Sequence, residues 1–330
     1  MRIGISQQPA ARTAEASNSR PTPPTVRGKP RVPTLAIIVV TAALIGCNYV
    51  ALKAATPYAT PLALTGLRAA IGGTALLLFA LARGERMPRD PRSLLGIFLV
   101  SLLVSTGSSG LLVLGVRRVA SGLAALASAT MPLFAAIFAV AFLKERLRRT
   151  MVLGTAVGLS GALVLASPAL SGRSSLVGIV LLLAATSTWG AGVVLQKGWQ
   201  REGEPAVSAV MFVALQLLMS AVTLLAISTP VEGWGGIQVG WKLAVPLVFS
   251  AIPSMAIPFA MLNTVLRRAP AIQAAAMGYL IPVFGVLASW LVRGEVLASA
   301  EWAGGALIMV GVVLVNLPAG FRVRRNSPRE

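Results

Sequence analysis

The chain has 330 residues, of which 56% are hydrophobic and 12% are charged. A soluble domain of this length would need more polar surface, so the composition indicates an all-α integral membrane protein. Histidine is absent and Cys47 is the single cysteine. Disulfides, Cys-His nucleophile pairs and metal sites built from His or Cys are therefore excluded, and we expect no metal and no cofactor.

The net charge of +19 has the sign found in nucleic-acid-binding proteins. The basic residues, however, lie mainly in the tails and between apolar runs, and no basic stripe is interleaved with aromatic residues that would stack on bases. We interpret these charges as signals for membrane topology, so the expected partners are the lipid bilayer and a small-molecule solute, with no nucleic acid.

Residues 1–33 combine several prolines with Ser, Thr and Arg, which predicts a disordered basic tail and no cleaved signal peptide. A second basic tail covers residues 319–330. Between the tails lie ten apolar segments, each close to the length needed to cross a bilayer. They cover residues 34–53, 61–82, 94–115, 119–143, 151–168, 176–196, 206–228, 243–263, 270–292 and 302–318.

An even number of spans places both ends of the chain on one side of the membrane. Of the 29 Lys and Arg residues, 22 fall on the side of the tails, six fall on the other side, and Arg68 lies within a span. Because positively charged loops stay in the cytoplasm, both termini are predicted to be cytoplasmic in a multi-pass protein of the inner or plasma membrane.

The segment 119–145 returns, without a gap, 150 residues later as 269–295, so that Pro132 falls on Pro282. This match indicates an internal repeat, with units at 34–168 and 176–318. Each unit holds five spans, an odd number, and the second therefore enters the bilayer in the opposite sense. Two inverted five-helix repeats are typical of carriers, whose solute site lies near the midplane.

Prolines interrupt three of the predicted spans. In mid-span, Pro132 and Pro282 free the carbonyls of Ser128 and Gly278, and such carbonyls are tolerated only inside protein or beside a wet cavity. The span 243–263 holds three prolines, which suggests a flexible or broken helix suited to gating, although a kink fixed by packing would have the same pattern. The candidate gating residues are Pro132, Pro253, Pro258 and Pro282.

The first unit contains GVRRVASGLAAL at 115–126, MPLF at 131–134 and LKERL at 143–147. This pattern resembles the EamA domain of the drug/metabolite transporter superfamily, and the resemblance covers about residues 34–318. It implies ten spans, a central cavity between two five-span units, and export or exchange of small metabolites, above all amino acids. The chain departs from the family pattern around Val113-Leu114, where an aromatic residue is frequent, and at Arg293-Gly294-Glu295.

Several polar or aromatic side chains stand among apolar neighbours inside the predicted spans. Such residues would either offer hydrogen bonds and a packing surface to a solute or join one helix to another. The candidate substrate-binding residues are Asn48, Tyr49, Arg68, Ser128, Thr130, Trp189, Gln216, Ser254, Gln273 and Tyr279.

Arg68 is the one charge well inside a predicted span, and a buried charge requires a partner or a function. No Asp or Glu lies within the predicted spans. The expected partners of Arg68 are therefore helix carbonyls, the outer surface reached by snorkelling, or an anionic group on the solute. Glu145 and Glu295 end their spans beside basic residues, which predicts an interfacial ion pair for each.

Together these patterns predict a secondary transporter that exports or exchanges small organic metabolites, amino acids or related compounds. A non-transporting structural or assembly protein and an exporter of drug-like cations are the alternatives. An enzyme is not expected, because acid, base and metal groups are missing from the spans. The oligomeric state is left open, since a monomer is sufficient for a cavity.

Overall fold

The computed structural model describes residues 32–144, 149–170, 174–201, 207–259, 261 and 271–316. Glu145, the side chains of Gln273 and Tyr279, and nearly all of the two predicted tails lie outside the residues and side chains so described. Within the described residues every regular element is a helix, in agreement with the predicted all-α class.

The helices follow the predicted apolar segments closely. In the described part of the chain, nine helical stretches are long and apolar enough to cross a membrane. The predicted segment 270–292 coincides with a further helix whose described side chains begin at Leu280. The elements are α1 (Val32–Ala55), α2 (Pro61–Ala82), α3 (Pro91–Ser101), η1 (Leu102–Gly107), α4 (Ser108–Val116), α5 (Ser121–Ser128), α6 (Met131–Leu143), α7 (Arg149–Leu170), α8 (Leu176–Arg201), α9 (Ala209–Val231), α10 (Trp241–Ala251), η2 (Ile252–Ala256), α12 (Ala271–Arg293) and α13 (Ser299–Asn316).

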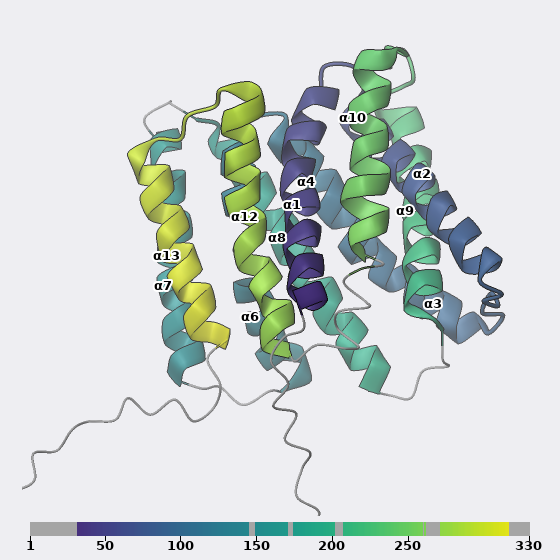
Figure 1. The fold of residues 1–330 in the computed structure, drawn as a ribbon, viewed down its shortest axis with the longest axis horizontal. Helices are drawn as coiled ribbons and strands as arrows, with labels where there is room; N and C mark the ends of the chain where they lie inside the picture. Colours follow the sequence, from purple (N-terminus) through teal and green to yellow (C-terminus); the bar gives the residue numbers. More distant parts are fainter. Residues whose placement is uncertain are drawn as a thin grey trace, which may run out of the picture.

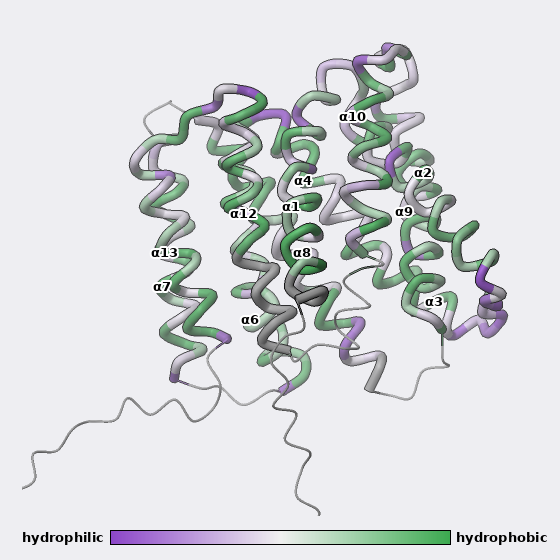
Figure 2. Tube along the Cα trace, viewed as in Figure 1, coloured by the Kyte–Doolittle hydropathy of each residue, from purple (hydrophilic) through white to green (hydrophobic). Residues whose placement is uncertain are grey.

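The helices run side by side, and their apolar middles lie between two more polar ends (Figures 1 and 2). α1 begins and α13 ends at the same face of the bundle, which is drawn at the bottom of Figure 1. We call this face the lower face. The opposite, upper face carries the ends of α1, α4 and α12. This arrangement agrees with an even number of crossings between α1 and α13.

At the predicted kink near Pro132, a two-residue turn at positions 129–130 separates two helices of one span. α5 ends at Ser128, and α6 starts at Met131 with Pro132 in its first turn, where a missing N–H leaves no hydrogen bond unmade. The hydroxyl of Thr130 donates to the carbonyl of Ala127 at 2.7 Å and lies 2.9 Å from the hydroxyl of Thr186 on α8. These bonds stabilise the broken backbone within the bundle.

Two spans contain short π-helical segments. η1 joins α3 to α4, and η2, which includes Pro253, follows α10. A π-helical turn inserts a residue into the helix and is frequent at functional sites. Of the three prolines expected to break the span 243–263, Pro253 lies in η2, whereas Pro246 lies inside α10 and Pro258 follows η2.

α7 and α13 form the most extensive helix pair in the described structure, at one edge of the bundle (Figure 1). Glycines allow their backbones to touch. A Cβ atom on Gly304 would lie 2.4 Å from the backbone nitrogen of Leu165, and one on Gly311 would lie 2.5 Å from the carbonyl oxygen of Gly154. Close packing of small residues is a common basis of helix association in membranes.

Acidic side chains cap helices within their own part of the chain. A carboxylate oxygen of Asp90 accepts from the backbone N–H of Ser93 at 3.0 Å at the start of α3. Glu301, in the first turn of α13, accepts from the N–H of Ala298 at 2.7 Å. Both satisfy amide groups that a helix N-terminus leaves without intrahelical partners.

Two further carboxylates cap helices that are distant in sequence. Glu232, just after α9, accepts from the N–H groups of Leu62 at 3.0 Å and Ala63 at 3.3 Å in α2. Glu85, just after α2, accepts from the hydroxyl of Ser208, which is the N-cap of α9. α2 and α9, which pack together, therefore exchange capping contacts in both directions.

Candidate functional site

A cavity of about 300 Å³ lies inside the bundle. Its lining is mainly apolar, with a small number of polar groups, as in most sites for small molecules. The lining residues come from helices of both predicted units and are Ile45, Asn48, Tyr49, Arg68, Val104, Ser105, Ser108, Ser109, Leu112, Met131, Pro132, Trp189, Leu217, Ser254, Met255, Pro258, Phe259, Ile281, Val312 and Asn316.

The structure brings half of the predicted site residues to this cavity. Asn48, Tyr49, Arg68, Trp189 and Ser254 line it. Two of the predicted gating residues, Pro132 and Pro258, do so as well.

The remaining described candidates lie outside the lining. Ser128 donates to the carbonyl of Ala125, and Thr130 is bonded to α8 as described above. Gln216 is one layer behind the wall, where its amide nitrogen donates to the lining hydroxyl of Ser105 at 2.7 Å. Pro253 and Pro282 are also outside the lining.

Arg68 is buried, with 3% of its surface exposed. Its Nη1 atom lies 3.1 Å from the hydroxyl of Ser250 and 3.4 Å from the amide oxygen of Asn48, and Nη2 lies 3.4 Å from the hydroxyl of Ser109. Ser250 in turn donates to the Asn48 oxygen at 2.7 Å. Among the described residues its hydrogen-bond partners are side chains and not helix carbonyls. Burial of the side chain contradicts the expected snorkelling to the outer surface.

Two polar atoms of this lining have no hydrogen-bond partner among the described residues. They are Nε of Arg68 and the hydroxyl oxygen of Ser254, and both are buried. A buried polar group without a partner is costly, because it loses its hydrogen bonds to water without replacement. Both residues line the same cavity.

Sequence reasoning missed the serines of η1 and α4 at the cavity wall, which are Ser105, Ser108 and Ser109. The spacing of these serines in the sequence does indicate a shared face. Together with Ser101 they recur at intervals of three and four residues, so they share one face of a helix. A polar stripe on an otherwise apolar span points toward a cavity or another helix.

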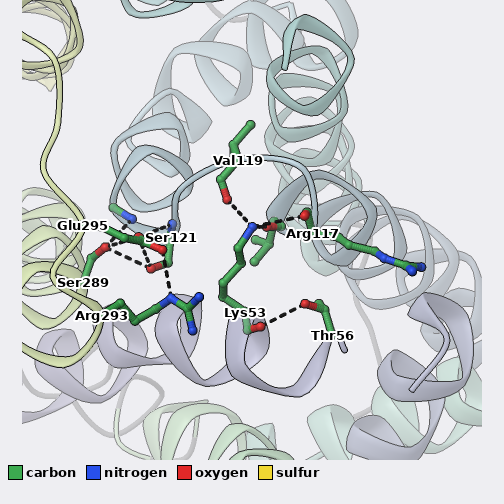
Figure 3. A network of polar contacts seen from close by, with 10 residues as sticks. Lys53, Thr56, Arg117, Val119, Ser121, Ser289, Arg293 and Glu295 are labelled. Carbon is green, nitrogen blue, oxygen red and sulfur yellow. Dashed lines mark hydrogen bonds and ion pairs between the residues drawn. The ribbon is translucent and has the colours of Figure 1, made fainter. Parts of the chain in front are cut away.

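A second polar cluster, drawn from close by in Figure 3, lies near the helix ends of the upper face, and its residues are not part of the cavity lining. The Nζ atom of Lys53, near the end of α1, donates to three carbonyl oxygens at the end of α4 and in the turn that follows it. The distances are 2.9 Å to Val116, 3.1 Å to Arg117 and 2.7 Å to Val119. Lys53 thus fixes α1 to the turn between α4 and α5.

Glu295 joins the same turn to the loop between α12 and α13. Its carboxylate accepts from the backbone N–H and the hydroxyl of Ser121, both at 2.7 Å, and from the hydroxyl of Ser289 (Figure 3). Arg293 pairs with it at 2.9 Å, as the sequence predicts. Partial burial opposes ionisation, but the hydrogen bonds from Ser289, Ser121 and Arg293 outweigh it and lower the pKa of Glu295 to about 2.

Comparison with known proteins gives consistent results. Residues 33–167 and 176–317 each match the EamA-like transporter family. The uncharacterized transporter YvbV of Bacillus subtilis is 28% identical over 288 residues, which cover 87% of this chain and 92% of that protein. A probable amino-acid metabolite efflux pump of Salmonella typhimurium is 29% identical over 301 residues, covering 89% and 96%.

A crystal structure matches the fold with a TM-score of 0.61 at 20% identity, covering 86% of this chain and 98% of the other. The family match occurs twice and includes every helix that lines the cavity. The chain therefore belongs to the EamA-like transporter family and is a multi-pass membrane transporter.

Proposed function

We propose that this protein is a secondary transporter that exports or exchanges small organic metabolites, amino acids or related compounds, across the plasma membrane. The observation that carries the proposal is the central cavity, which is mainly apolar and holds one buried cation. The name of the Salmonella relative, a probable amino-acid metabolite efflux pump, supports this class of solute.

The proposed architecture is ten spans in two inverted five-helix repeats, with α12 as the ninth span. Reciprocal capping supports it. Glu85 follows α2 and contacts the N-cap of α9, while Glu232 follows α9 and contacts the start of α2. A pseudo-two-fold axis in the membrane plane would produce such an exchange.

We propose that the described conformation is open toward the cytoplasm. The cavity extends to Asn316, an exposed residue at the lower end of α13, and the positive-inside rule places that end in the cytoplasm. At the upper face, Lys53 and Glu295 hold three helix connections together. Transport would then require these contacts to open while the lower face closes, with bending at Pro132, Pro253, Pro258 and Pro282.

The acidic residues support a transporter without a built-in proton relay. Each of the five described carboxylates caps a helix N-terminus or bonds to its N-cap residue, and no described carboxylate lines the cavity. Acid–base catalysis needs such a group within hydrogen-bond reach of the substrate. We therefore expect transport to follow the solute gradient more than the pH gradient, and no enzymatic activity.

The test is counterflow into proteoliposomes with labelled amino acids, purines and cationic drugs. Accumulation of an amino acid or a related metabolite, driven by unlabelled solute inside, is the expected result. Accumulation of the cationic drugs alone would favour a drug exporter, and no movement of any solute would favour a structural protein. A steep dependence on an imposed pH step that survives Glu145→Gln with Glu295→Gln would contradict the expected coupling.

A further inference from the structure

We propose that the cavity selects a solute with a free carboxylate, which binds to the Nε edge of Arg68 and to the hydroxyl of Ser254. This inference rests on the proposed transport function and assigns the chemistry of its solute. Within the broad class of small organic metabolites, the expected solutes are then organic anions and amino acids that bind through their carboxylate.

Arg68 carries a buried positive charge that no described side chain balances. Its described partners, Asn48, Ser109 and Ser250, are neutral, and no carboxylate of the described chain lines the cavity. A buried ion is stable when it is paired with an opposite charge and satisfied by hydrogen bonds. The three neutral contacts supply hydrogen bonds without supplying the missing negative charge, which a solute would bring.

The guanidinium of Arg68 has one donor that is free to bind a solute. Its partners occupy Nη1 and one position on Nη2, while Nε, which is buried, remains without a partner. Nε–H and one N–H of Nη2 point in the same direction and match the two oxygens of a carboxylate. Nε is therefore a donor on the side-on edge of Arg68 that the described protein leaves unused, and Nη2 beside it makes one described hydrogen bond.

Ser254 lies on η2, in a different span from Arg68. Its hydroxyl is buried in the same lining and has no partner among the described groups. A hydroxyl donates readily to a carboxylate oxygen. One anionic group would satisfy both buried atoms, and the π-helical turn places Ser254 at the wall without a bond to its own helix.

The rest of the lining suits an apolar body. Leu112, Trp189 and Leu217 are among the apolar wall residues. A primary amine without a carboxylate would meet the cation of Arg68 and no described anion. The cavity therefore favours a carboxylate over the matching amide, and it disfavours a solute that carries only a positive charge.

The experiment measures binding to the purified full-length protein by calorimetry. The probes are N-acetylleucine and N-acetylleucinamide, which differ only in the carboxylate, with the corresponding alanine and phenylalanine pairs to vary the apolar body. We expect at least one acid to bind about tenfold or more tightly than its amide. Equal binding of all pairs, preference for the amides, or no binding by any of the acids would overturn the inference.

Arg68→Gln is expected to abolish the preference for the acid, whereas Arg68→Lys retains part of it. Because Arg68 joins four helical segments, its loss is also expected to destabilise the fold. Ser254→Ala removes no hydrogen bond present in the described structure, so it should unfold at the wild-type temperature and weaken acid binding by about threefold to tenfold. Unchanged acid binding by Ser254→Ala would contradict its assigned contact.

Thr60→Val is the matched control. The hydroxyl of Thr60 is also buried without a described partner, but it lies at the N-cap of α2, outside the cavity lining. We expect wild-type binding of the acids. Counterflow of any solute by the wild type, combined with equal binding of acids and amides, would reject the carboxylate site and leave the transport function standing.

Discussion

The carboxylate of Glu295 accepts hydrogen bonds from both the backbone N–H and the hydroxyl of Ser121, at 2.7 Å each, across 174 residues of sequence. Ser121 begins α5 in the first matched region, and Glu295 follows α12 in the second. One side chain therefore joins the two halves at the upper face and satisfies a helix N-terminus at the same time.

Replacement of Glu295 by Gln is expected to lower the temperature of thermal unfolding. The amide provides one acceptor in place of two charged oxygens, and loss of a charged hydrogen bond at a partly buried site costs about 1–3 kcal/mol. Arg293→Gln is the matched control, since it removes only a half-exposed ion pair of about 0–1 kcal/mol. An equal loss in both variants would contradict the capping role.

The effect of Glu295→Gln should depend on pH with a definite sign. The pKa of Glu295 is about 2 in the folded protein and 4.5 as the ordinary value. A lowered pKa means that the carboxylate stabilises the fold fully above pH 4.5 and loses this contribution as the pH falls toward 2. The gap in unfolding temperature between wild type and variant should therefore be constant near neutral pH and narrow below pH 4.5.

Pro132→Ala should reduce the transport rate more than the amount of folded protein. With an N–H restored at position 132, α5 and α6 can join into one helix. Residues 131 and 132, which line the cavity in the described structure, would then move away from its wall. The measurement is counterflow rate per folded transporter. Pro230→Ala, near the end of α9 and outside the lining, is the control and should transport as wild type.

Gly311→Leu should prevent α13 from packing on α7. The added side chain would begin 2.5 Å from the Gly154 carbonyl oxygen, and overpacking of this kind costs about 1–3 kcal/mol or more. We expect lower yield and aggregation in size-exclusion chromatography. Gly235→Ala, where a Cβ meets nothing within 4 Å, should leave both unchanged.

Topology reporters test the orientation of the bundle. A reporter fused after Arg325 or within 84–92 is expected to report the cytoplasm, and one within 55–60 the opposite side, because of the asymmetry of basic residues. A C-terminal reporter active outside the cytoplasm would contradict the ten-span arrangement and the proposed direction of opening.

Sequence patterns predicted the spans well because length and apolar character alone define them. The predicted segment 61–82 coincides with α2 (Pro61–Ala82). The partners of Arg68 were not predictable in the same way. Its contact with Ser250 spans 182 positions, and which hydroxyls approach a buried charge is decided by helix packing.

Asn48 shows why alternatives left open by a sequence need not exclude each other. It lines the cavity and also bonds to α10 through Ser250, so it has the location expected of a binding residue and the contact expected of an interhelical residue. The carboxylate caps between distant helices were missed for another reason. Glu232 acts on Leu62, and no local pattern links residues so far apart.

The turn between α4 and α5 joins two helix ends of opposite polarity. Lys53 binds the carbonyls of Val116 and Arg117 that end α4, the negative end of that helix dipole, while Glu295 binds the first amide of α5, at the positive end. The two charges are matched to the direction of the chain, not to each other. The double variant Lys53→Glu with Glu295→Lys would place each charge against a helix end of its own sign. Charge reversal of both residues often restores an ion pair, but here it would not restore the stability lost in either single variant.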